Sequence, residues 1–278
     1  MILEGEIVAG GSTRAEVEQI LDKIIPVEKR NFVYVFRLRG GENMLRQVRK
    51  SGNGIKVFSF DVDGTLVSMR FADCVWLQGI PEAYAAKEGV SFEQAFDFVK
   101  SEYDKIGDNR VEWYRMDYWL QKFGLSTTRE ELFGKYKGEV EIYEEVESVL
   151  KVLKAEGFKL VISSNAAIEF VEFQIRPIRK YFSLVFSATS DFGEVKKSNG
   201  FYARVCEIAD VKPHEVVHIG DHWVFDFVNP REIGMTAYFL DRGRKRGRGR
   251  SGSGNVKNEE FVISDLKEIL DKEVSGGN

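Results

Sequence analysis

The 278-residue sequence has little cysteine and no long apolar segment. Its two cysteines, Cys74 and Cys206, are too few for a disulfide framework and lack the spacing of metal ligands. No run reaches the length of about 18 apolar residues that a membrane-spanning helix requires, and the first residues lack the basic start and apolar centre of a signal peptide. We therefore expect a reduced, cytoplasmic protein that has no membrane partner.

The net charge is also small. The 40 lysines and arginines nearly balance the 44 aspartates and glutamates, which gives a formal net charge of −4. Such a weak field favours neither nucleic acid nor membranes as partners. Residues 242–250 are the exception, because arginines and a lysine are interspersed there with glycines. This segment could contact a phosphate backbone, but we interpret it as a solvated loop, since the rest of the chain offers no basic face.

With 43% hydrophobic residues, the chain can bury a core. Beyond residue 55, short apolar runs alternate with helical patterns, as they do in parallel strands that are covered on both faces. This order predicts an α/β fold, with a Rossmann-like, doubly wound parallel sheet. The expected strands are 56–60, 158–163, 184–187, 215–219 and 236–240. The expected helices are 143–156, 167–181 and 199–209.

Two segments do not fit this alternation. Residues 1–55 predict a small strand–helix–strand extension, whose second strand covers 32–38 and is followed by a polar, glycine-containing linker. Residues 69–142 contain no convincing strand, but their apolar residues recur at helical spacing, and Ser91 and Thr128 begin capping boxes. The expected domains are the N-terminal extension (1–55), a helical cap (69–142) and a catalytic core (56–68 and 143–278).

The segment KVFSFDVDGTLV carries the strongest functional signal. Its apolar strand ends at Asp61, and Asp63 follows two residues later. Ligands of open α/β sheets bind beyond the carboxyl ends of the strands, so both carboxylates can face one crevice. Gly64 lets the chain turn sharply and brings backbone N–H groups near a ligand. A DxDGT pattern directly after a buried strand is therefore far more specific than an isolated DxD pair.

Three further polar clusters follow in the predicted core. LVISSNA ends a strand with Ser164 and Asn165, KKSNG contains two lysines, and VVHIGDHWVFD ends a strand before Asp221 and Asp226. In a parallel sheet these clusters collect at one edge with Asp61. So many carboxylates repel one another, and oxygen ligands without His or Cys favour Mg²⁺. A cation and a lysine suit a phosphate dianion, and a carboxylate can act as the nucleophile through an aspartyl-phosphate.

Together these four elements resemble the haloacid dehalogenase superfamily, in the branch with a helical cap after the first core strand. DxDGT matches its first motif, Ser-Asn its second, a lysine its third and GDxxxxD its fourth, over residues 56–275. The resemblance implies that Asp61 is the nucleophile and binds Mg²⁺ through its side chain. It implies that Asp63 protonates the leaving oxygen, then activates water, and touches the metal with its backbone carbonyl. Ser164 would hold a phosphoryl oxygen.

The resemblance also suggests roles for the other site residues. Asp221 would bind the metal, and Asp226 would be a metal ligand or a neighbour of one. A lysine would neutralise charge on the transferring phosphoryl group. Lys196 suits this role better than Lys197, because the helix that follows then has the usual length. The expected substrate-binding residues are Thr65, Asn165 and, on the cap side, Arg70.

The acidic residue at position 63 discriminates among reactions. Superfamily members that cleave carbon–halogen or carbon–phosphorus bonds lack an acid at the position of Asp63. We therefore expect a Mg²⁺-dependent phosphatase, a phosphoric monoester hydrolase that acts on a small phosphorylated metabolite. A sugar phosphomutase would share these residues and stays an alternative, as does a nucleic-acid-associated binding module that uses 242–250. The sequence leaves the substrate, the oligomeric state and the role of residues 1–55 open.

Overall fold

The chain divides into two units, residues 1–52 and residues 53–278. The first strand and the helix of the predicted extension, and most of the basic segment 242–250, lie outside the described residues. The computed structural model describes residues 34–37, 43–46, 54–243 and 256–274.

Two short strands are described in the first unit. β1 (Tyr34–Arg37) pairs antiparallel with β2 (Asn43–Arg46), so that Val35 is opposite Leu45. β1 lies within the predicted strand 32–38. β2 was not predicted, because its polar residues and the glycines before it are typical of a linker.

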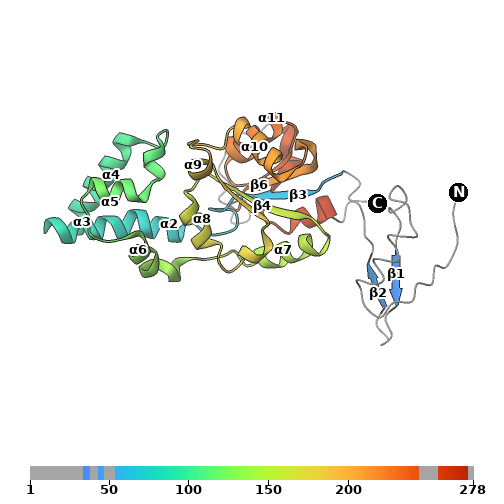
Figure 1. The fold of residues 1–278 in the computed structure, drawn as a ribbon, viewed down its shortest axis with the longest axis horizontal. Helices are drawn as coiled ribbons and strands as arrows, with labels where there is room; N and C mark the ends of the chain where they lie inside the picture. Colours follow the sequence, from blue (N-terminus) through green and yellow to red (C-terminus); the bar gives the residue numbers. More distant parts are fainter. Residues whose placement is uncertain (1–33, 38–42, 47–53, 244–255, 275–278) are drawn as a thin grey trace. The chain divides into compact units, whose positions relative to one another are not determined.

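The second unit is built around a six-stranded sheet in the order β5-β4-β3-β6-β7-β8, with all neighbours parallel. Figure 1 shows α10 and α11 on one face of this sheet and α7 on the other, which confirms the predicted Rossmann-like α/β fold. The strands are β3 (Val57–Phe60), β4 (Lys159–Ser164), β5 (Leu184–Ser187), β6 (Val216–Gly220), β7 (Thr236–Leu240) and β8 (Val262–Ile263). The helices are α7 (Val146–Ala155), α8 (Ile168–Gln174), α9 (Ala188–Asp191), α10 (Asn199–Ala209) and α11 (Asn229–Glu232).

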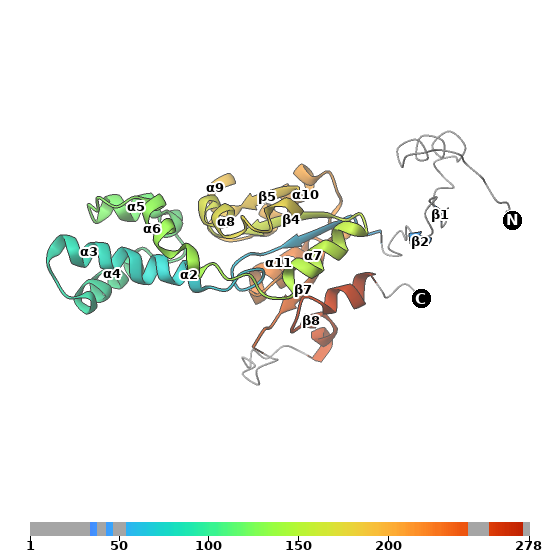
Figure 2. The same cartoon turned by 90° about the horizontal axis from the view of Figure 1, so that it is seen from below.

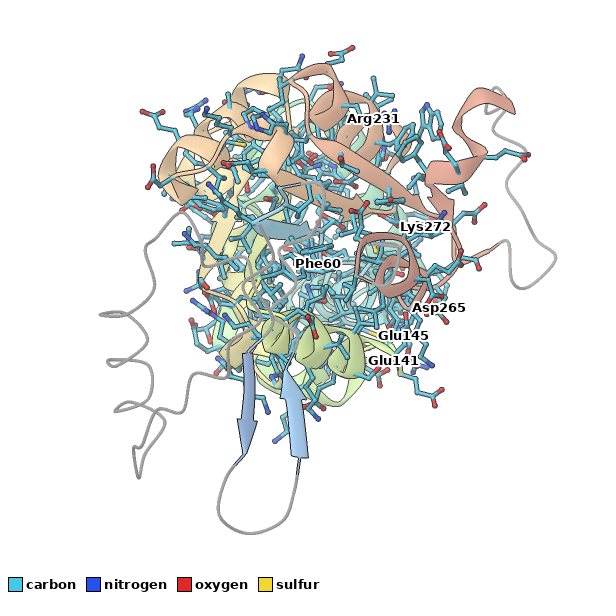
Figure 3. All side chains as sticks on the ribbon, turned by 90° about the vertical axis from the view of Figure 1, so that its right-hand side faces the viewer. Phe60, Glu141, Glu145, Arg231, Asp265 and Lys272 are labelled. Atoms are coloured by element: carbon cyan, nitrogen blue, oxygen red, sulfur yellow. The ribbon has the colours of Figure 1, made fainter. Side chains whose placement is uncertain are left out.

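Alternate side chains of β3 point to opposite faces of the sheet, which is why helices cover both faces. Val57 packs into an apolar cluster with Phe201 and Val205 of α10. Phe58 and Phe60 belong to the cluster on the other face, which includes the apolar side chains of α7. In Figure 3, Phe60 lies in the middle of the packed side chains. This two-sided packing fixes the strand ends that carry the polar residues.

Between β3 and β4, residues 70–139 form helices and turns without a strand, and we call this segment the helical insert. Its apolar cluster contains Phe71, Trp119 and Phe133 and continues onto Phe170 of α8. Figure 2 shows the insert extending beyond one end of the sheet. The cap boundaries at 69 and 142 stay predictions. The helices are α2 (Arg70–Cys74), α3 (Ile80–Glu88), α4 (Phe92–Ile106), α5 (Met116–Lys122) and α6 (Arg129–Tyr136), and a π-helical turn, Val75–Gly79, joins α2 to α3.

Local sequence decides where several helices begin and end. Ser91 and Thr128 both form the predicted capping boxes at the starts of α4 and α6. The helix predicted over 167–181 is shorter, since α8 ends at Gln174. Pro177 explains this end, because it has no backbone N–H and disfavours a helical conformation in the residue before it. None of the helices in the described part of the chain combines the length and apolarity needed to cross a bilayer.

Candidate active site

Carboxylates that the sequence singles out meet at the carboxyl edge of the sheet. β3 lies between β4 and β6, and its last residue, Phe60, pairs with Ile162 of β4 and Ile219 of β6, so the three strands end close to one another. Asp61 follows β3 and Asp221 follows β6, so these two side chains start from neighbouring strand ends. Together with Asp226, they bring carboxylate oxygens within 4.8 Å of one another. This cluster is the centre of the candidate active site.

Lys197 lies beside these carboxylates and is almost entirely buried. Its Nζ donates to Asp61 Oδ1 at 2.5 Å and to the Ser163 carbonyl oxygen at 3.1 Å, and it forms an ion pair with Asp226. Burial alone would lower the pKa of the lysine, but Asp226 and Asp61 raise it above the usual value. Lys197 therefore keeps its positive charge beside Asp61.

The placement of Lys197 corrects the expectation that Lys196 faces the carboxylates. Lys196 is partly exposed, and its Nζ donates to Asn109 Oδ1 at 2.9 Å and pairs with Asp108 at 3.2 Å, both in the helical insert. The backbone N–H of Lys197 donates to Asn165 Oδ1 at 2.7 Å. This bond fixes the loop so that Lys197 points inward, which helix length alone could not reveal.

The three carboxylates differ in how their surroundings affect ionisation. Burial raises the pKa of Asp61 well above its usual value, although Lys197 opposes the shift. Asp221 keeps surface open to solvent, but the protein packed around it and the charge of Asp226 raise its pKa to about 7. Burial would also raise the pKa of Asp226, yet Lys197 and a hydrogen bond with His218 hold it below the usual value. Asp226 is thus the ionised partner of Lys197.

The donor set fits a hard divalent cation. The carboxylate oxygens of Asp61, Asp221 and Asp226 converge, and no described His or Cys belongs to the group. Asp226 already has partners at both oxygens, because Oδ1 pairs with Lys197 and Oδ2 accepts from the backbone N–H of His222 at 3.0 Å. A cation would therefore be held chiefly by Asp61 and Asp221, whose mutual repulsion it would relieve.

Two glycines permit this crowding. Gly64 has a φ of +79°, and a Cβ at this position would collide with the Asp221 carboxylate. A Cβ at Gly220 would collide with the side chain of Asp226. The glycines of the DxDGT and GDxxxxD patterns are therefore required for the approach of the two acidic side chains.

Asp63 does not belong to the cluster of Asp61, Asp221 and Asp226, and its side chain contacts α8. Gln174, which is completely buried, donates through Nε2 to Asp63 Oδ1 at 3.0 Å. Burial raises the pKa of Asp63, and the hydrogen bond from Gln174 partly opposes this shift. No sequence pattern pointed to Gln174, since a glutamine at the end of an amphipathic helix is common on protein surfaces.

The remaining motif residues surround Asp61. Thr65 Oγ1 donates to Asp61 Oδ2 at 3.3 Å, and Ser164, which is buried, accepts from the backbone N–H of Ala166 at 3.1 Å. Asn165 uses its side-chain oxygen to position Lys197 and also lines a cavity. The structure thus brings Thr65, Ser164 and Asn165 to the same strand ends as Asp61.

Arg70 is not brought to this group. Its Nη2 pairs with Glu139 Oε2 at 2.6 Å within the helical insert, and the arginine side chain is exposed. It does not line the cavity beside Asp63. The expected contact of Arg70 with substrate therefore has no support in its position, and the surface ion pair explains its charge.

We call residues 61–65, the turn after β3 that carries the candidate catalytic aspartates, the catalytic turn. Arg242 contacts this turn, and sequence analysis missed the contact. Its guanidinium donates to the Gly64 carbonyl at 3.2 Å through Nε and to the Thr65 carbonyl at 2.7 Å through Nη2. Nη1 pairs with the buried Glu145 at 2.7 Å, and the group lies 3.6 Å from the ring centre of Tyr143. Its place at the start of a basic, glycine-rich segment made Arg242 look like part of a solvated loop.

A cavity of about 390 Å³ opens beside Asp63, between the core and the helical insert. Most of its surface is apolar or aromatic. Among the described residues that line it, Asp63 and Asp73 are the only charged ones, and none is basic. The lining residues are Asp63, Met69, Ala72, Asp73, Trp76, Leu77, Tyr103, Trp113, Tyr114, Asn165, Ala166, Ala167 and Phe170.

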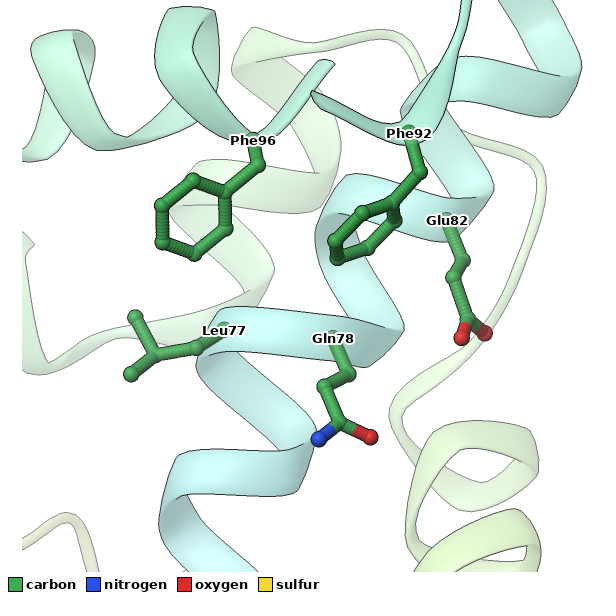
Figure 4. Close-up of a pocket in the computed structure, with 5 residues that line it drawn as sticks. All are labelled: Leu77, Gln78, Glu82, Phe92 and Phe96. Carbon is green, nitrogen blue, oxygen red and sulfur yellow. The ribbon is translucent and has the colours of Figure 1, made fainter. Parts of the chain in front are cut away.

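A second hollow, of about 460 Å³, lies on the helical insert itself. Figure 4 shows Phe92 and Phe96 of α4 facing Leu77 and Gln78 across it, with Glu82 at one side. None of the residues at the carboxyl edge of the sheet lines this hollow. It shares only Leu77 with the lining of the cavity beside Asp63 and does not reach the carboxylate cluster.

The molecule thus combines an α/β fold with a carboxylate cluster and a buried lysine at the carboxyl edge of its sheet. The family model of the haloacid dehalogenase-like hydrolases matches residues 55–227, and the chain belongs to this family. It is 26% identical over 163 residues to the GMP/IMP nucleotidase YrfG of Escherichia coli, which covers 58% of this chain and 72% of that protein. It is 30% identical over 103 residues to haloacid dehalogenase-like hydrolase domain-containing protein 3 of Danio rerio, over 37% of this chain and 42% of the relative. The predicted family is confirmed, and with it the enzyme class of a hydrolase.

Solved structures with the same fold include enzymes of different chemistry. A phosphatase of this family from Thermococcus onnurineus has a TM-score of 0.67 at 23% identity, over 81% of this chain and 99% of that one. A 2-haloacid dehalogenase from Pseudomonas syringae has a TM-score of 0.55 at 20% identity, over 80% and 98% of the two chains. At these identities the likeness shows the fold alone, so the reaction has to be argued from the site.

Proposed function

We propose that the protein is a Mg²⁺-dependent phosphatase, which hydrolyses the phosphate ester of a small metabolite through an aspartyl-phosphate on Asp61. One observation carries the proposal: Asp61 contacts a buried, charged Lys197 and also belongs to a carboxylate cluster that fits a divalent cation. A doubly charged phosphate needs positive charge on more than one side, and this arrangement can supply it.

In this proposal Asp61 attacks phosphorus. A bound Mg²⁺ would be held by Asp61, Asp221 and the Asp63 carbonyl, with Asp226 beside it, and would supply electrostatic stabilisation of the transferring group. Lys197 balances the negative charge that spreads over the phosphoryl oxygens, and it already contacts Asp61. The hydroxyl of Ser164 would hold one of these oxygens.

Asp63 would handle the protons. Burial raises its pKa, which favours a carboxylic acid that can protonate the leaving oxygen of the ester. Once the leaving group departs, the resulting carboxylate can take a proton from the water that attacks the aspartyl-phosphate. Gln174 would hold this side chain toward the cavity during both steps, because its amide donates to Asp63 Oδ1.

The cavity beside Asp63 favours a nucleoside monophosphate as the metabolite. Aromatic side chains such as Trp76, Tyr103 and Trp113 suit a flat base, and no lining side chain could neutralise a second acidic group. A substrate such as phosphoglycolate, whose second end is a carboxylate, would therefore be disfavoured. The name of the E. coli relative, a GMP/IMP nucleotidase, supports a purine nucleotide.

The two alternatives are less well supported. A sugar phosphomutase would use the same residues, but the aromatic cavity offers few polar groups for a hexose ring. A nucleic-acid-binding module would rely on the segment 242–250. Its first residue, Arg242, is engaged with the catalytic turn, and residues 244–250 lie outside the described part of the chain.

Phosphate release from GMP, IMP and an aryl phosphate, with and without Mg²⁺, tests the proposal. We expect turnover that needs Mg²⁺, is lost after chelation, and is abolished by Asp61→Asn, since an amide is a poor nucleophile. Full activity after thorough chelation, or in Asp61→Asn, would contradict the mechanism. Activity on the aryl phosphate but not on either nucleotide would contradict only the substrate class.

A further inference from the structure

One helical wall of the cavity leads away from the catalytic residues. Met69 stands where the chain leaves the core, and Asp73, Trp76 and Leu77 follow on the same side of the helix. At 1.5 Å per residue, Asp73 lies about 6 Å beyond Met69, and Trp76 about 4–5 Å further. The wall therefore offers a carboxylate in its middle and an aromatic ring at its far end.

Asp73 has no partner for its carboxylate among the described residues. The side chain is exposed to the cavity, and no described cation forms an ion pair with it. Partial burial raises its pKa. Asp73 and Asp63 line the same cavity, and the charge of Asp73 adds to the effect of burial in raising the pKa of Asp63. The Asp73 carboxylate therefore faces a mostly apolar cavity with its oxygens free to accept hydrogen bonds from a ligand.

The aromatic side chains beyond Asp73 are held in place. Trp76 stacks on Phe170 with ring centres 5.3 Å apart and planes inclined by 11°. Tyr103 donates its hydroxyl hydrogen to the Trp76 carbonyl at 3.2 Å. Because these rings are fixed before substrate arrives, little entropy is lost when a planar group packs against them.

We propose that Asp73 is a specificity-determining residue that accepts hydrogen bonds from the ribose hydroxyls of a nucleoside 5′-monophosphate. The inference rests on the proposed phosphatase function. In such a nucleotide, phosphate, sugar and base follow one another, and the cavity offers Asp63 at its catalytic end, then Asp73 and Trp76 along its helical wall. A carboxylate accepts from two neighbouring hydroxyls at once, as it does in the ribose sites of many nucleotide-binding proteins.

A different chemistry would also place a carboxylate among aromatic rings. Quaternary ammonium groups are bound in aromatic cages by cation–π attraction, and a carboxylate strengthens such a site. Asp73 and Trp76 follow one another along one helical wall, and this elongated order favours the nucleotide. Phosphocholine belongs in the assay as the competing substrate.

The test compares GMP with its 2′-deoxy and 2′,3′-dideoxy analogues. For the natural chain we expect kcat/KM to fall by about 10- to 100-fold from GMP to the dideoxy analogue, the loss typical of hydrogen bonds to a charged group. In Asp73→Ala the three substrates should be hydrolysed at nearly equal kcat/KM. Asp73→Asn keeps one acceptor oxygen and should recover part of the preference. Asp97→Ala removes an exposed carboxylate of α4 that does not line the cavity, and should keep the full preference.

The ratio between the three substrates cancels any general loss of folded or active enzyme, so a merely structural role of Asp73 would leave it unchanged. Equal hydrolysis of the three nucleotides by the natural chain would overturn the inference, as would an unaltered ratio in Asp73→Ala or a preference for phosphocholine. If the aryl phosphate is hydrolysed in these cases, the phosphatase assignment stands. Absence of all phosphatase activity would instead refute the proposed function.

Discussion

Lys197 determines how much negative charge the site can hold. In the proposed mechanism Asp61 attacks phosphorus only when it is ionised, yet burial and two neighbouring carboxylates raise its pKa. The lysine contacts both Asp61 and Asp226, so it stabilises two charges with one ammonium group. Removing it would leave buried carboxylates without their partner, which is among the most unfavourable changes in a protein interior.

We expect Lys197→Met to lower kcat on an aryl phosphate by at least about 100-fold, the effect of losing one stabilising group at a transition state. Methionine has nearly the length of lysine but no charge. Lys196→Met is the matched control, because the neighbouring Nζ contacts Asn109 and Asp108 instead. The control should retain most of its kcat. Equal losses in both variants, measured with melting curves to verify folding, would mean that the two lysines are not distinguished as their positions suggest.

Asp63→Asn should separate the two chemical steps. The amide oxygen of the new side chain can still accept from Gln174, and the backbone carbonyl of residue 63 is unchanged. What is lost is the acid for the leaving group and the base for water. With an activated aryl phosphate we expect Asp61 to become phosphorylated and then to turn over about 10²–10⁴ times more slowly than in the parent. Quenched-flow labelling with mass mapping would measure this, and a phosphoryl group on any other residue would refute the assignment.

At the scale of elements, the strand ends were the most predictable part of the site. β3, β4 and β6 are mostly apolar strands. Ser164 is the last residue of β4, Asp61 and Asp221 follow β3 and β6, and parallel pairing alone brings these residues together. Loops were less predictable, because their orientation depends on hydrogen bonds between distant residues. The bond from the Lys197 backbone to Asn165 decides which of two adjacent lysines points inward, and no local pattern records it.

Arg242 illustrates the same limit and connects β7 to the catalytic turn. Its donors satisfy two backbone carbonyls of that turn, and its guanidinium is fixed by Glu145 and Tyr143. The arginine therefore positions Gly64 and Thr65 without touching a reacting atom. A basic side chain after a strand has no sequence signature that separates this role from ordinary solvation.

Arg242→Met should lower both stability and turnover. Hydrogen bonds from a charged group contribute about 1.5–3 kcal/mol each, so the loss of two should be visible as a lower melting temperature. Turnover should fall because the turn that carries Asp63 and Thr65 becomes less well fixed. Deletion of 244–250 is the control, since this polar, glycine-rich stretch should contribute little to the core, and activity on a small substrate should persist. An active, fully stable Arg242→Met variant would show that the turn does not need the arginine.

At the scale of the whole second unit, the site lies where the core and the helical insert face each other. The cavity takes its catalytic end from Asp63 and Asn165 and its aromatic walls mostly from the insert. Lys196 joins the two parts through Asp108 and Asn109. The sequence predicted a helical segment here, but the cavity could not be predicted, because residues such as Trp76 and Trp113 have the same spacing as core aromatics. A large substrate would be obstructed by the insert, which agrees with a small metabolite.

Acidic crowding should make the unit sensitive to pH in the absence of metal. The pKa of Asp221 is raised to about 7, whereas an unfolded aspartate titrates near 4. Between these values the folded chain binds a proton at Asp221 that the unfolded chain does not bind. At low pH this group therefore stabilises the folded state of the metal-free protein. This contribution to the free energy of unfolding is lost as the pH rises through about 7.

Mg²⁺ should reverse this dependence, because it needs the ionised carboxylate and replaces the proton. We expect the rise in melting temperature that Mg²⁺ produces to be small at about pH 6 and clearly larger at about pH 8, since a ligand that binds only the folded state stabilises it more when it binds more tightly. Asp221→Asn should remove most of the Mg²⁺ effect at both pH values, whereas Asp97→Asn, the same change at an exposed site on α4, should leave it unaltered. Thermal melts of the three chains, with and without Mg²⁺, provide the measurement. A Mg²⁺ shift of equal size at both pH values, or one that survives in Asp221→Asn, would show that the cation does not bind at this carboxylate.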